Sequence, residues 1–335
     1  MKVCILGEGA WGTAVATLLA NNGHTVHVWC YHKEVAEDIK ENRSNSRYLP
    51  NIALDKNIVP FIDIEKALCD VDWVFEAIPV QYLRSILEQA QRCFNLKQTW
   101  VVLSKGIEKG SFLLPSQVID AVFATRVKKA IFSGPSFAKD LAEKQITGVT
   151  IAADDCETGQ QLSQLLANNY FRPYISLDVI GAQIGGALKN VITLGVGMLD
   201  GAGYTDNAKA FLLSRGFHEI VTIATLLGAQ CDTLYGLCGI GDLVLTAMGK
   251  HSKNLTVGRR LGKGEKLQNI LEETGYIPEG VNTVQAMHQY IKKNNLDLPV
   301  CDGIYQVIFQ DKKLEDMLAN LMQRRPLEVE CKRSL

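Results

Sequence analysis

The sequence predicts an α/β protein in which a doubly wound parallel sheet forms the N-terminal part and helices alone form the C-terminal part. Short β-rich runs alternate with helical patterns through the first half of the chain, as in parallel sheets covered by helices on both faces. After about residue 178 the strand signals nearly vanish and helical periods dominate. We therefore expect one domain over residues 1–178 and a second, all-α domain over residues 179–335.

The individual elements follow from the periodicity of apolar residues. The expected strands are Val3–Leu6, Thr25–Trp29, Trp73–Ala77, Thr99–Leu103, Lys129–Ser133, Gly148–Ala152 and Arg172–Leu177. The expected helices of the first half include Trp11–Asn21, Val80–Phe94, Leu114–Ala124 and Cys156–Asn168. Those of the second half are Ile180–Leu199, Asn207–Leu227, Ser252–Leu261, Val281–Lys292, Val300–Phe309 and Leu314–Met322.

A glycine motif stands between the first expected strand and the first expected helix. Gly7, Gly9 and Gly12 fit the pattern G-x-G-x-x-G in the strand-turn-helix context that dinucleotide binding requires. Such glycines allow a tight turn, a close approach of the backbone to a pyrophosphate, and close helix–strand packing. We therefore expect a Rossmann-type domain that binds NAD or NADP at the N-terminus of the first helix.

The end of the second strand bears on the choice between the two nucleotides. NAD-binding domains usually carry an Asp or Glu there for the ribose 2′-hydroxyl, whereas this chain has Tyr31, His32 and Lys33. These residues are interpreted either as a solvated surface turn or as a site that tolerates a 2′-phosphate. On the second interpretation, NADP is accepted as well as NAD.

Composition excludes several other classes of protein. The formal net charge of the 335 residues is −1, which gives no global field for nucleic acid or anionic membranes. No signal peptide is visible, and the nine cysteines, with no zinc-type CxxC pair, suggest free thiols in the cytoplasm. No cluster of metal ligands is apparent, so no metal is expected. The longest apolar stretch contains Lys189, which would cost roughly 2.5 kcal/mol at a bilayer centre, so we predict a buried helix there.

The segment around Lys189 is the first candidate reaction centre. Gly185 and Gly186 inside a helix cost about 1 kcal/mol each relative to Ala, and the close approach of a helix, cofactor or substrate would offset that cost. Lys189 shares a face with Gly185, and its apolar flanks would lower its pKa toward the range of acid–base catalysis. The alternative is a lysine whose ammonium reaches solvent.

Polar residues in other segments could meet Lys189. Asp242 and Thr246 are four residues apart in an apolar run, and Asp242 is interpreted either as an N-cap or as a carboxylate that balances an active-site lysine. Lys105 follows a strand, at the edge of the sheet where ligands bind, and is interpreted either as a lysine of a surface loop or as a substrate contact. Ser136 and Ser252 each precede a helix and are interpreted either as N-caps or as parts of anion sites.

These segments together closely resemble the bacterial NAD(P)-dependent glycerol-3-phosphate dehydrogenases, over roughly residues 2 to 310 and in the family's order. The matching pieces are GEGAWGTAVA at 7–16, Ile78-Pro79, Ser104-Lys105-Gly106, SGPSFAKDLA at 133–142, IGGALKNVI at 184–192, GIGDLVLT at 239–246, SKN at 252–254 and Pro278-Glu279-Gly280. The resemblance implies reversible reduction of dihydroxyacetone phosphate to sn-glycerol 3-phosphate, which supplies the backbone of phospholipids.

The resemblance also implies roles for individual residues. Lys189 resembles the proton donor to the substrate C2 oxygen, with Lys105 and Asp242 beside the reacting atoms. The expected substrate contacts are Lys105, Gly134, Ser136, Lys189, Asn190, Asp242, Thr246, Ser252, Lys253 and Asn254. The expected cofactor contacts are Gly7, Gly9, Ala10, Trp11, Gly12, Tyr31, His32, Lys105, Ala138, Lys253, Ile277 and Glu279.

Three positions depart from the family pattern. Glu8 replaces the usual Ala after the first glycine, and an acid there should repel a pyrophosphate unless it points away. Ala10 replaces a Ser, so a hydroxyl contact is lost while backbone contacts remain. Lys253 replaces an Arg, which keeps the charge but loses the bidentate fork.

Two other functions compete with this interpretation. A hydroxyacid dehydrogenase of related architecture would bind carboxylates, and the segments at 133–142 and 239–246 argue against it. A sensor that binds NADP without chemistry would not need Lys105, Lys189 and Asp242. The apolar helical part suggests a homodimer, with a small-molecule substrate as the other partner.

Overall fold

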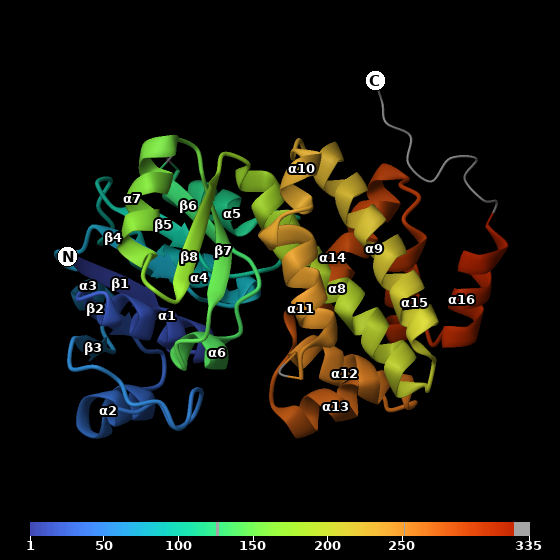
Figure 1. The fold of residues 1–335 in the computed structure, drawn as a ribbon, viewed down its shortest axis with the longest axis horizontal. Coiled ribbons are helices and arrows are strands. Elements are labelled where there is room, and N and C mark those ends of the chain that lie inside the picture. Colours follow the sequence, from blue (N-terminus) through green and yellow to red (C-terminus); the bar gives the residue numbers. More distant parts are fainter. Residues whose placement is uncertain (125–126, 251, 325–335) are drawn as a thin grey trace.

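The computed structural model describes residues 1–124, 127–250 and 252–324, and contains one eight-stranded sheet with the strand order β3-β2-β1-β4-β5-β6-β7-β8. The sheet lies on one side of the molecule, and helices from α8 onward gather on the other (Figure 1). The strands are β1 Lys2–Leu6, β2 Thr25–Trp29, β3 Ile58–Phe61, β4 Trp73–Glu76, β5 Thr99–Val102, β6 Lys129–Ser133, β7 Thr147–Ala153 and β8 Phe171–Ser176. The predicted Rossmann-type fold is thereby confirmed.

Helices cover both faces of this sheet because successive strand residues point in opposite directions. Val3 and Ile5 of β1 face a core shared with α1, α2, α6 and α7, whereas Cys4 and Leu6 face a core shared with α3, α4 and α5. These helices are α1 Ala10–Asn21, α2 Lys33–Asn42, α3 Ile64–Leu68, α4 Val80–Ala90, α5 Pro115–Phe123, α6 Ala138–Ala142 and α7 Cys156–Leu166. Both cores are apolar, so the strands read as continuous hydrophobic runs.

One strand was not expected from the sequence. β3 contains Pro60, which cannot donate to a neighbouring strand and therefore argues against a central strand. The structure places β3 at the edge of the sheet, paired only with β2 among the described strands. An edge position tolerates the proline.

The sheet is also not wholly parallel, in contrast to the expectation. β7 runs antiparallel to β6, with Ser133 opposite Thr150. The connection between them contains only α6, whose five residues span about 7.5 Å, too short to carry the chain back across the sheet. The chain therefore re-enters the sheet from the same edge, in the opposite direction.

The second half of the chain is helical in the described residues. Its helices are α8 Val179–Gly201, α9 Asp206–Leu226, α10 Cys231–Leu234, the π-helix η1 Leu237–Gly241, α11 Asp242–Met248, α12 Lys253–Gly262, α13 Leu267–Thr274, α14 Glu279–Asn294, α15 Pro299–Phe309 and α16 Leu314–Gln323. The short elements α10, η1, α11 and α13 were not among those expected. α8 runs through the centre of the group and contacts α9, α11, α12, α14 and α15 (Figure 1).

Two segments are long and apolar enough to cross a membrane, α8 and Cys231–Met248. In α8, 89% of the apolar window is buried against the rest of the protein, so the predicted buried helix is confirmed. The second segment is divided among α10, η1 and α11, and 39% of its window is buried. α8 therefore uses its apolar surface as the core of the helical half.

Candidate active site

A buried cluster of two lysines and one aspartate lies where the sheet meets the helical half. The Asp242 carboxylate accepts a hydrogen bond from Lys189 Nζ through Oδ1 and one from Lys105 Nζ through Oδ2, the latter at 2.6 Å. Lys189 Nζ also donates to Thr246 Oγ1 at 2.7 Å. Asp242 is 1% exposed. The structure therefore brings together four of the predicted site residues from three separate segments.

Glycines of α8 make room for this cluster. A Cβ atom on Gly185 would lie 2.6 Å from the carbonyl oxygen of Cys238 in η1, so the glycine allows α8 and η1 to touch. A Cβ atom on Gly186 would lie 2.9 Å from Ser133 Oγ and 3.4 Å from Lys105 Cδ. Close approaches were expected to offset the energetic cost of the two helical glycines. Gly185 makes one of them, with η1, and Gly186 makes the other, with the end of β6 and the Lys105 side chain.

Burial changes the acidity of Lys189. Its side chain is 8% exposed, so desolvation disfavours the charged amine, and the nearby Lys105 adds repulsion. Asp242 opposes both effects, and the pKa of Lys189 falls from 10.5 to about 8. The alternative of a lysine that reaches solvent is thereby wrong. An amine with this pKa is mostly protonated at neutral pH and can still lose its proton readily.

Lys105 is fixed by the ends of two strands. Its Nζ donates to the carbonyl oxygen of Gly134, which follows β6, at 3.0 Å. Ser136 Oγ donates to the same carbonyl at 3.0 Å, so Ser136 holds the turn rather than capping α6. Just before Lys105, Ser104 donates through its hydroxyl to Glu76 Oε1 at 2.6 Å.

Glu76 is a residue that the sequence interpretation missed. It is fully buried at the end of β4, and this burial raises its pKa from 4.5 to about 8. Its carboxylate accepts from Ser104 and from the backbone N–H of Ile78 at 3.3 Å, so it ties the loop that carries Lys105 to the end of β4. The sequence did contain a signal for Glu76, because it is a single acidic residue at the end of an apolar strand.

Asparagines extend the cluster toward α12 and α14. Asn254 Nδ2 donates to Asn190 Oδ1 at 2.9 Å, and the backbone N–H of Gly280 donates to Asn254 Oδ1 at 3.0 Å. Ser252 caps α12 by accepting from the backbone N–H of Leu255 at 3.2 Å. The predicted substrate residues of α12 thus lie beside those of α8.

Lys253 lies apart from Lys189 and Lys105. Its Nζ is 4.5 Å from the centre of the Tyr276 ring, a cation–π contact, and the side chain is on the exposed side of α12. No bond from Lys253 to Asp242 or Asn190 is present in the described structure. The structure therefore places this cation at the rim of the site.

The glycine loop between β1 and α1 fits a dinucleotide. Gly7 has a positive φ of 114°, and a Cβ atom on Gly12 would lie 2.1 Å from the carbonyl oxygen of Gly7. A Cβ atom on Gly9 would meet nothing within 4 Å in the described structure, so this glycine faces open space. Gly9 is the N-cap of α1 and offers no side-chain cap, which leaves the first N–H groups, including that of Ala10, for a ligand.

Several buried polar atoms around the glycine loop and the loop that carries Lys105 lack a partner in the described structure. They are Trp11 Nε1, Ser133 Oγ, Glu279 Oε2 and Thr283 Oγ1. Trp11 packs edge-on against Phe132 with its indole N–H unused. Glu279 Oε2 lies beside the loop that carries Lys105, 2.9 Å from where a Cβ atom on Gly106 would be. Burial raises the pKa of Glu279 to about 7. Ser133 opens the SGPSFAKDLA segment that the sequence interpretation singled out, whereas Thr283 was missed because the sequence has no local signal for it.

The remaining predicted cofactor residues lie at the rim of this region. Tyr31 and His32 follow β2, and the Tyr31 ring is 71% exposed. Ala138 opens α6, and Ile277, 52% exposed, precedes α14. Glu8 points away from the glycine loop and toward Tyr31 and His32, so the expected repulsion of a pyrophosphate is avoided.

Comparison with known families decides between the candidate enzymes. The profile described as NAD-dependent glycerol-3-phosphate dehydrogenase N-terminus matches residues 2–159, and the one described as its C-terminus matches residues 178–319. The chain belongs to the NAD-dependent glycerol-3-phosphate dehydrogenase family. "Glycerol-3-phosphate dehydrogenase [NAD(P)+]" of Bacillus pumilus (strain SAFR-032) is 40% identical over 325 residues, 96% of this chain and 94% of the relative.

Solved structures agree with this family membership. Glycerol-3-phosphate dehydrogenase from Coxiella burnetii is 28% identical and superposes with a TM-score of 0.92, covering 96% of this chain and 99% of that one. The complex of D-mandelate dehydrogenase with NADH superposes with a TM-score of 0.64 at 17% identity, over 93% of this chain and 98% of that one, and therefore shares the fold alone. The resemblance inferred from the motifs is confirmed, and the hydroxyacid dehydrogenase alternative loses its support.

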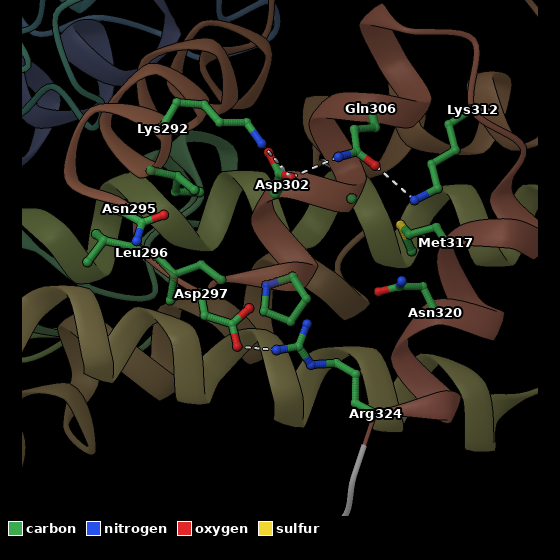
Figure 2. A pocket seen from close by; sticks show the side chains of 14 residues that line it. Lys292, Asn295, Leu296, Asp297, Asp302, Gln306, Lys312, Met317, Asn320 and Arg324 are labelled. Carbon is green, nitrogen blue, oxygen red and sulfur yellow. Dashed lines mark hydrogen bonds and ion pairs between the residues drawn. The ribbon is translucent and has the colours of Figure 1, made fainter.

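A cavity elsewhere in this glycerol-3-phosphate dehydrogenase family member does not compete with the lysine cluster. A hollow of about 330 Å³ lies among α14, α15 and α16, and none of the predicted site residues lines it. Figure 2 shows the side chains around it. Two of its cations are in ion pairs, Lys292 with Asp302 at 3.6 Å and Arg324 with Asp297, and a third, Lys312, donates to Gln306 Oε1 at 2.8 Å. Across the described ranges, no group of three or more His, Cys, Asp or Glu side chains is arranged to hold a metal ion. The lysine cluster is therefore the candidate active site.

Proposed function

We propose that this protein catalyses the reversible reduction of dihydroxyacetone phosphate to sn-glycerol 3-phosphate with NADH or NADPH. The observation that carries the proposal is the buried Lys189–Asp242–Lys105 cluster beside a glycine loop that fits a dinucleotide. The names of the relatives and of the matching profiles support the same reaction. Since sn-glycerol 3-phosphate is the backbone of glycerophospholipids, we assign the reaction to glycerophospholipid synthesis.

In this mechanism, Lys189 is the acid. A reduced nicotinamide, when bound, would supply the hydride for the ketone carbon. Negative charge then develops on the C2 oxygen, where the Lys189 ammonium stabilises it and donates its proton. The carboxylate of Asp242 and the hydroxyl of Thr246 hold the amine in place, because both bond directly to Lys189 Nζ. In the reverse direction the neutral amine accepts the proton from the C2 hydroxyl.

Lys105 supports the same chemistry from the opposite side of Asp242. Its ammonium is 19% exposed at the side chain and is tied to Gly134 and Asp242. We assign Lys105 to orienting the substrate beside the nicotinamide and to balancing the charge of Asp242. Since two cations share one carboxylate, the cluster carries a net positive charge that favours an anionic substrate.

The substrate phosphate is assigned to the start of α12. The N-terminus of this helix offers N–H groups next to Ser252, Lys253 and Asn254. Asn254 bonds to Asn190 of α8, which connects this anion site with the helix that carries Lys189. Binding energy from the phosphate then orients the distant carbonyl for reaction.

The cofactor is assigned to the C-terminal edge of β1, β2, β4 and β5, at the point where the strand order reverses between β1 and β4. Backbone groups of Gly9, Ala10, Trp11 and Gly12 would hold the pyrophosphate, and Tyr31 and His32 would flank the adenosine. Lys105, Ala138, Ile277 and Glu279 would line the nicotinamide side. The buried unpartnered indole N–H of Trp11 and carboxylate oxygen of Glu279 support this assignment.

The division of the chain follows from these assignments. We propose that residues 1–178 bind the dinucleotide and that residues 179–335 bind the substrate and form a homodimer. We also place the enzyme in the cytoplasm, because all eight cysteines in the described part of the chain are free thiols, Cys231 and Cys238 included.

Oxidation of NADH and NADPH by the purified protein with dihydroxyacetone phosphate tests the reaction. We expect rapid loss of reduced-cofactor absorbance, and none with a 2-keto acid of similar size. Cofactor binding without turnover of dihydroxyacetone phosphate would instead support the sensor. Turnover of the keto acid alone would support a hydroxyacid dehydrogenase.

A further inference from the structure

The carboxylate of Glu8 accepts hydrogen bonds from the backbone N–H groups that follow β2, which could otherwise bind an anionic ligand. Its Oε2 accepts from the backbone N–H of Tyr31 at 3.1 Å, and its Oε1 accepts from the backbone N–H of His32 at 3.1 Å. The ring Nδ1 of His32 lies 2.6 Å from the same Oε1. The Glu8 side chain is 6% exposed. An acid from the glycine loop thus stands where the second strand of NAD-binding domains usually supplies one.

The backbone of Glu8 is held as firmly as its side chain. Asn45 Nδ2 donates to the carbonyl oxygen of Glu8 at 2.7 Å, and Thr13 Oγ1 donates to it at 3.0 Å. Asn45 and Thr13 are both buried and bond to each other at 2.8 Å. The direction of the Glu8 side chain is therefore set by a network rather than by a flexible turn.

The hydrogen-bond capacity of this carboxylate is almost full. An ionised carboxylate offers about four acceptor positions, and the three donors from Tyr31 and His32 take three of them. One position on Oε2 is left. A hydroxyl group can donate to that position, whereas a phosphate ester can only repel it.

We propose that Glu8 makes this enzyme selective for NAD over NADP. The inference rests on the proposed function, because it concerns the adenosine end of the same cofactor site. Glu8 accepts a hydrogen bond from the ribose 2′-hydroxyl of NAD. It disfavours NADP in two ways, by repelling the 2′-phosphate and by occupying the N–H groups of Tyr31 and His32 that would bind it.

Two nearby cations are each paired with a carboxylate of α2. Lys33 Nζ lies 3.3 Å from Glu37 Oε1, and Arg47 Nη1 lies 2.7 Å from Glu34 Oε1. A 2′-phosphate would have to replace one of these carboxylates while facing Glu8. Under this proposal the turn after β2 disfavours NADP, although its His32 and Lys33 suggested tolerance of a 2′-phosphate.

The test is direct binding, measured by isothermal titration calorimetry with ADP and 2′,5′-ADP and then with NAD and NADP. We expect the wild-type protein to bind ADP and NAD at least about tenfold more tightly than their 2′-phosphorylated counterparts, as for one hydrogen bond to a charged group. Glu8→Ala should weaken ADP and strengthen 2′,5′-ADP, changing their ratio by about a hundredfold. Glu8→Gln removes the charge but keeps the shape, and should strengthen 2′,5′-ADP with little loss of ADP.

Glu41→Gln is the matched control, because it removes one negative charge from the exposed surface of α2. It should leave the ratio unchanged. If wild type binds both ligands of each pair equally, or if Glu8→Ala weakens both by the same factor, the specificity role is wrong and Glu8 only holds the turn. If the wild-type protein binds none of the four nucleotides, both the specificity role of Glu8 and the proposed function are wrong. Selective binding without turnover of dihydroxyacetone phosphate would overturn the proposed reaction and leave the role of Glu8 intact.

Discussion

Lys189 of α8 and Asp242 of α11 form a buried ion pair across 53 positions of sequence. Asp242 is also the partner of Lys105, so one carboxylate holds two ammonium groups that would otherwise repel each other. Neither lysine could be buried alone without a large desolvation cost. The arrangement keeps Lys189 protonated near neutral pH while burial lowers its pKa, which is what a proton donor requires.

Lys189→Ala should abolish turnover while cofactor binding persists. The substitution removes the only group assigned to donate the proton, and general acid catalysis contributes about 10²- to 10⁴-fold. Steady-state rates and the Kd for NAD measure the two effects separately. Lys189→Arg should be similarly inactive, because a guanidinium does not release its proton. Residual activity near that of wild type in either variant would refute the assigned role.

The two directions of the reaction should respond oppositely to pH around the pKa of Lys189, about 8. Reduction needs the protonated amine, so its kcat should be level below pH 8 and fall about tenfold per pH unit above it. Oxidation needs the neutral amine, so its kcat should rise toward pH 8 and then level off. Rate profiles in both directions on the same enzyme check this, and parallel profiles would contradict it.

Asp242→Asn should move the reduction profile to lower pH. The carboxylate raises the pKa of Lys189 and opposes burial and Lys105, so its removal lets that pKa fall further. At about pH 9, where the amine is already mostly neutral, kcat should drop by about tenfold for each unit that the pKa falls, whereas at neutral pH the first unit costs only about twofold. Thr246→Val is the comparison, since it removes a neutral partner of Lys189 and should shift the profile much less. An unshifted profile for Asp242→Asn would show that the ion pair does not tune Lys189.

Gly9→Ala and Gly12→Ala should separate binding from folding. A Cβ atom on Gly9 meets nothing within 4 Å in the described structure and its φ of −58° suits alanine, so stability should hold while NAD binding weakens at least about tenfold. A Cβ atom on Gly12 would lie 2.1 Å from the carbonyl oxygen of Gly7, and the strain should lower the free energy of unfolding by about 1–3 kcal/mol. Urea unfolding and calorimetry with NAD distinguish the two. Equal losses of stability would contradict the open space at Gly9.

Glu219→Ala should destabilise the helical half. The Glu219 carboxylate accepts from the backbone N–H groups of Val300, at 2.6 Å, and Cys301, at 2.9 Å, at the buried start of α15. Truncation leaves two buried donors unsatisfied, at a cost of about 2–4 kcal/mol in the free energy of unfolding. Glu219→Gln keeps one acceptor oxygen and should lose about half as much. Urea denaturation of the three proteins side by side provides the check.

Much of the fold and part of the site were predictable from the sequence alone. The seven expected strands and the long helices follow from apolar periodicity. The glycine spacing predicted the loop after β1, where the backbone leaves no room for a side chain at Gly7 and Gly12. Lys189 beside paired glycines was also a local signal. β3 was missed because Pro60 is compatible only with an edge position, which the order of the sheet decides.

Tertiary structure alone decided how these parts meet. Lys105 and Asp242 are 137 positions apart, and their contact depends on how α11 packs against α8 and how α8 packs against β6 and β7. The sequence placed an acid at Glu8 next to a pyrophosphate site, whereas the structure turns it toward the end of β2. Periodicity and turn chemistry act over a few neighbouring residues, so they fix which face of an element is buried. The partners of a buried charge are chosen by distant segments, because the charge must be compensated by whatever the packed helices and strands bring within hydrogen-bond distance.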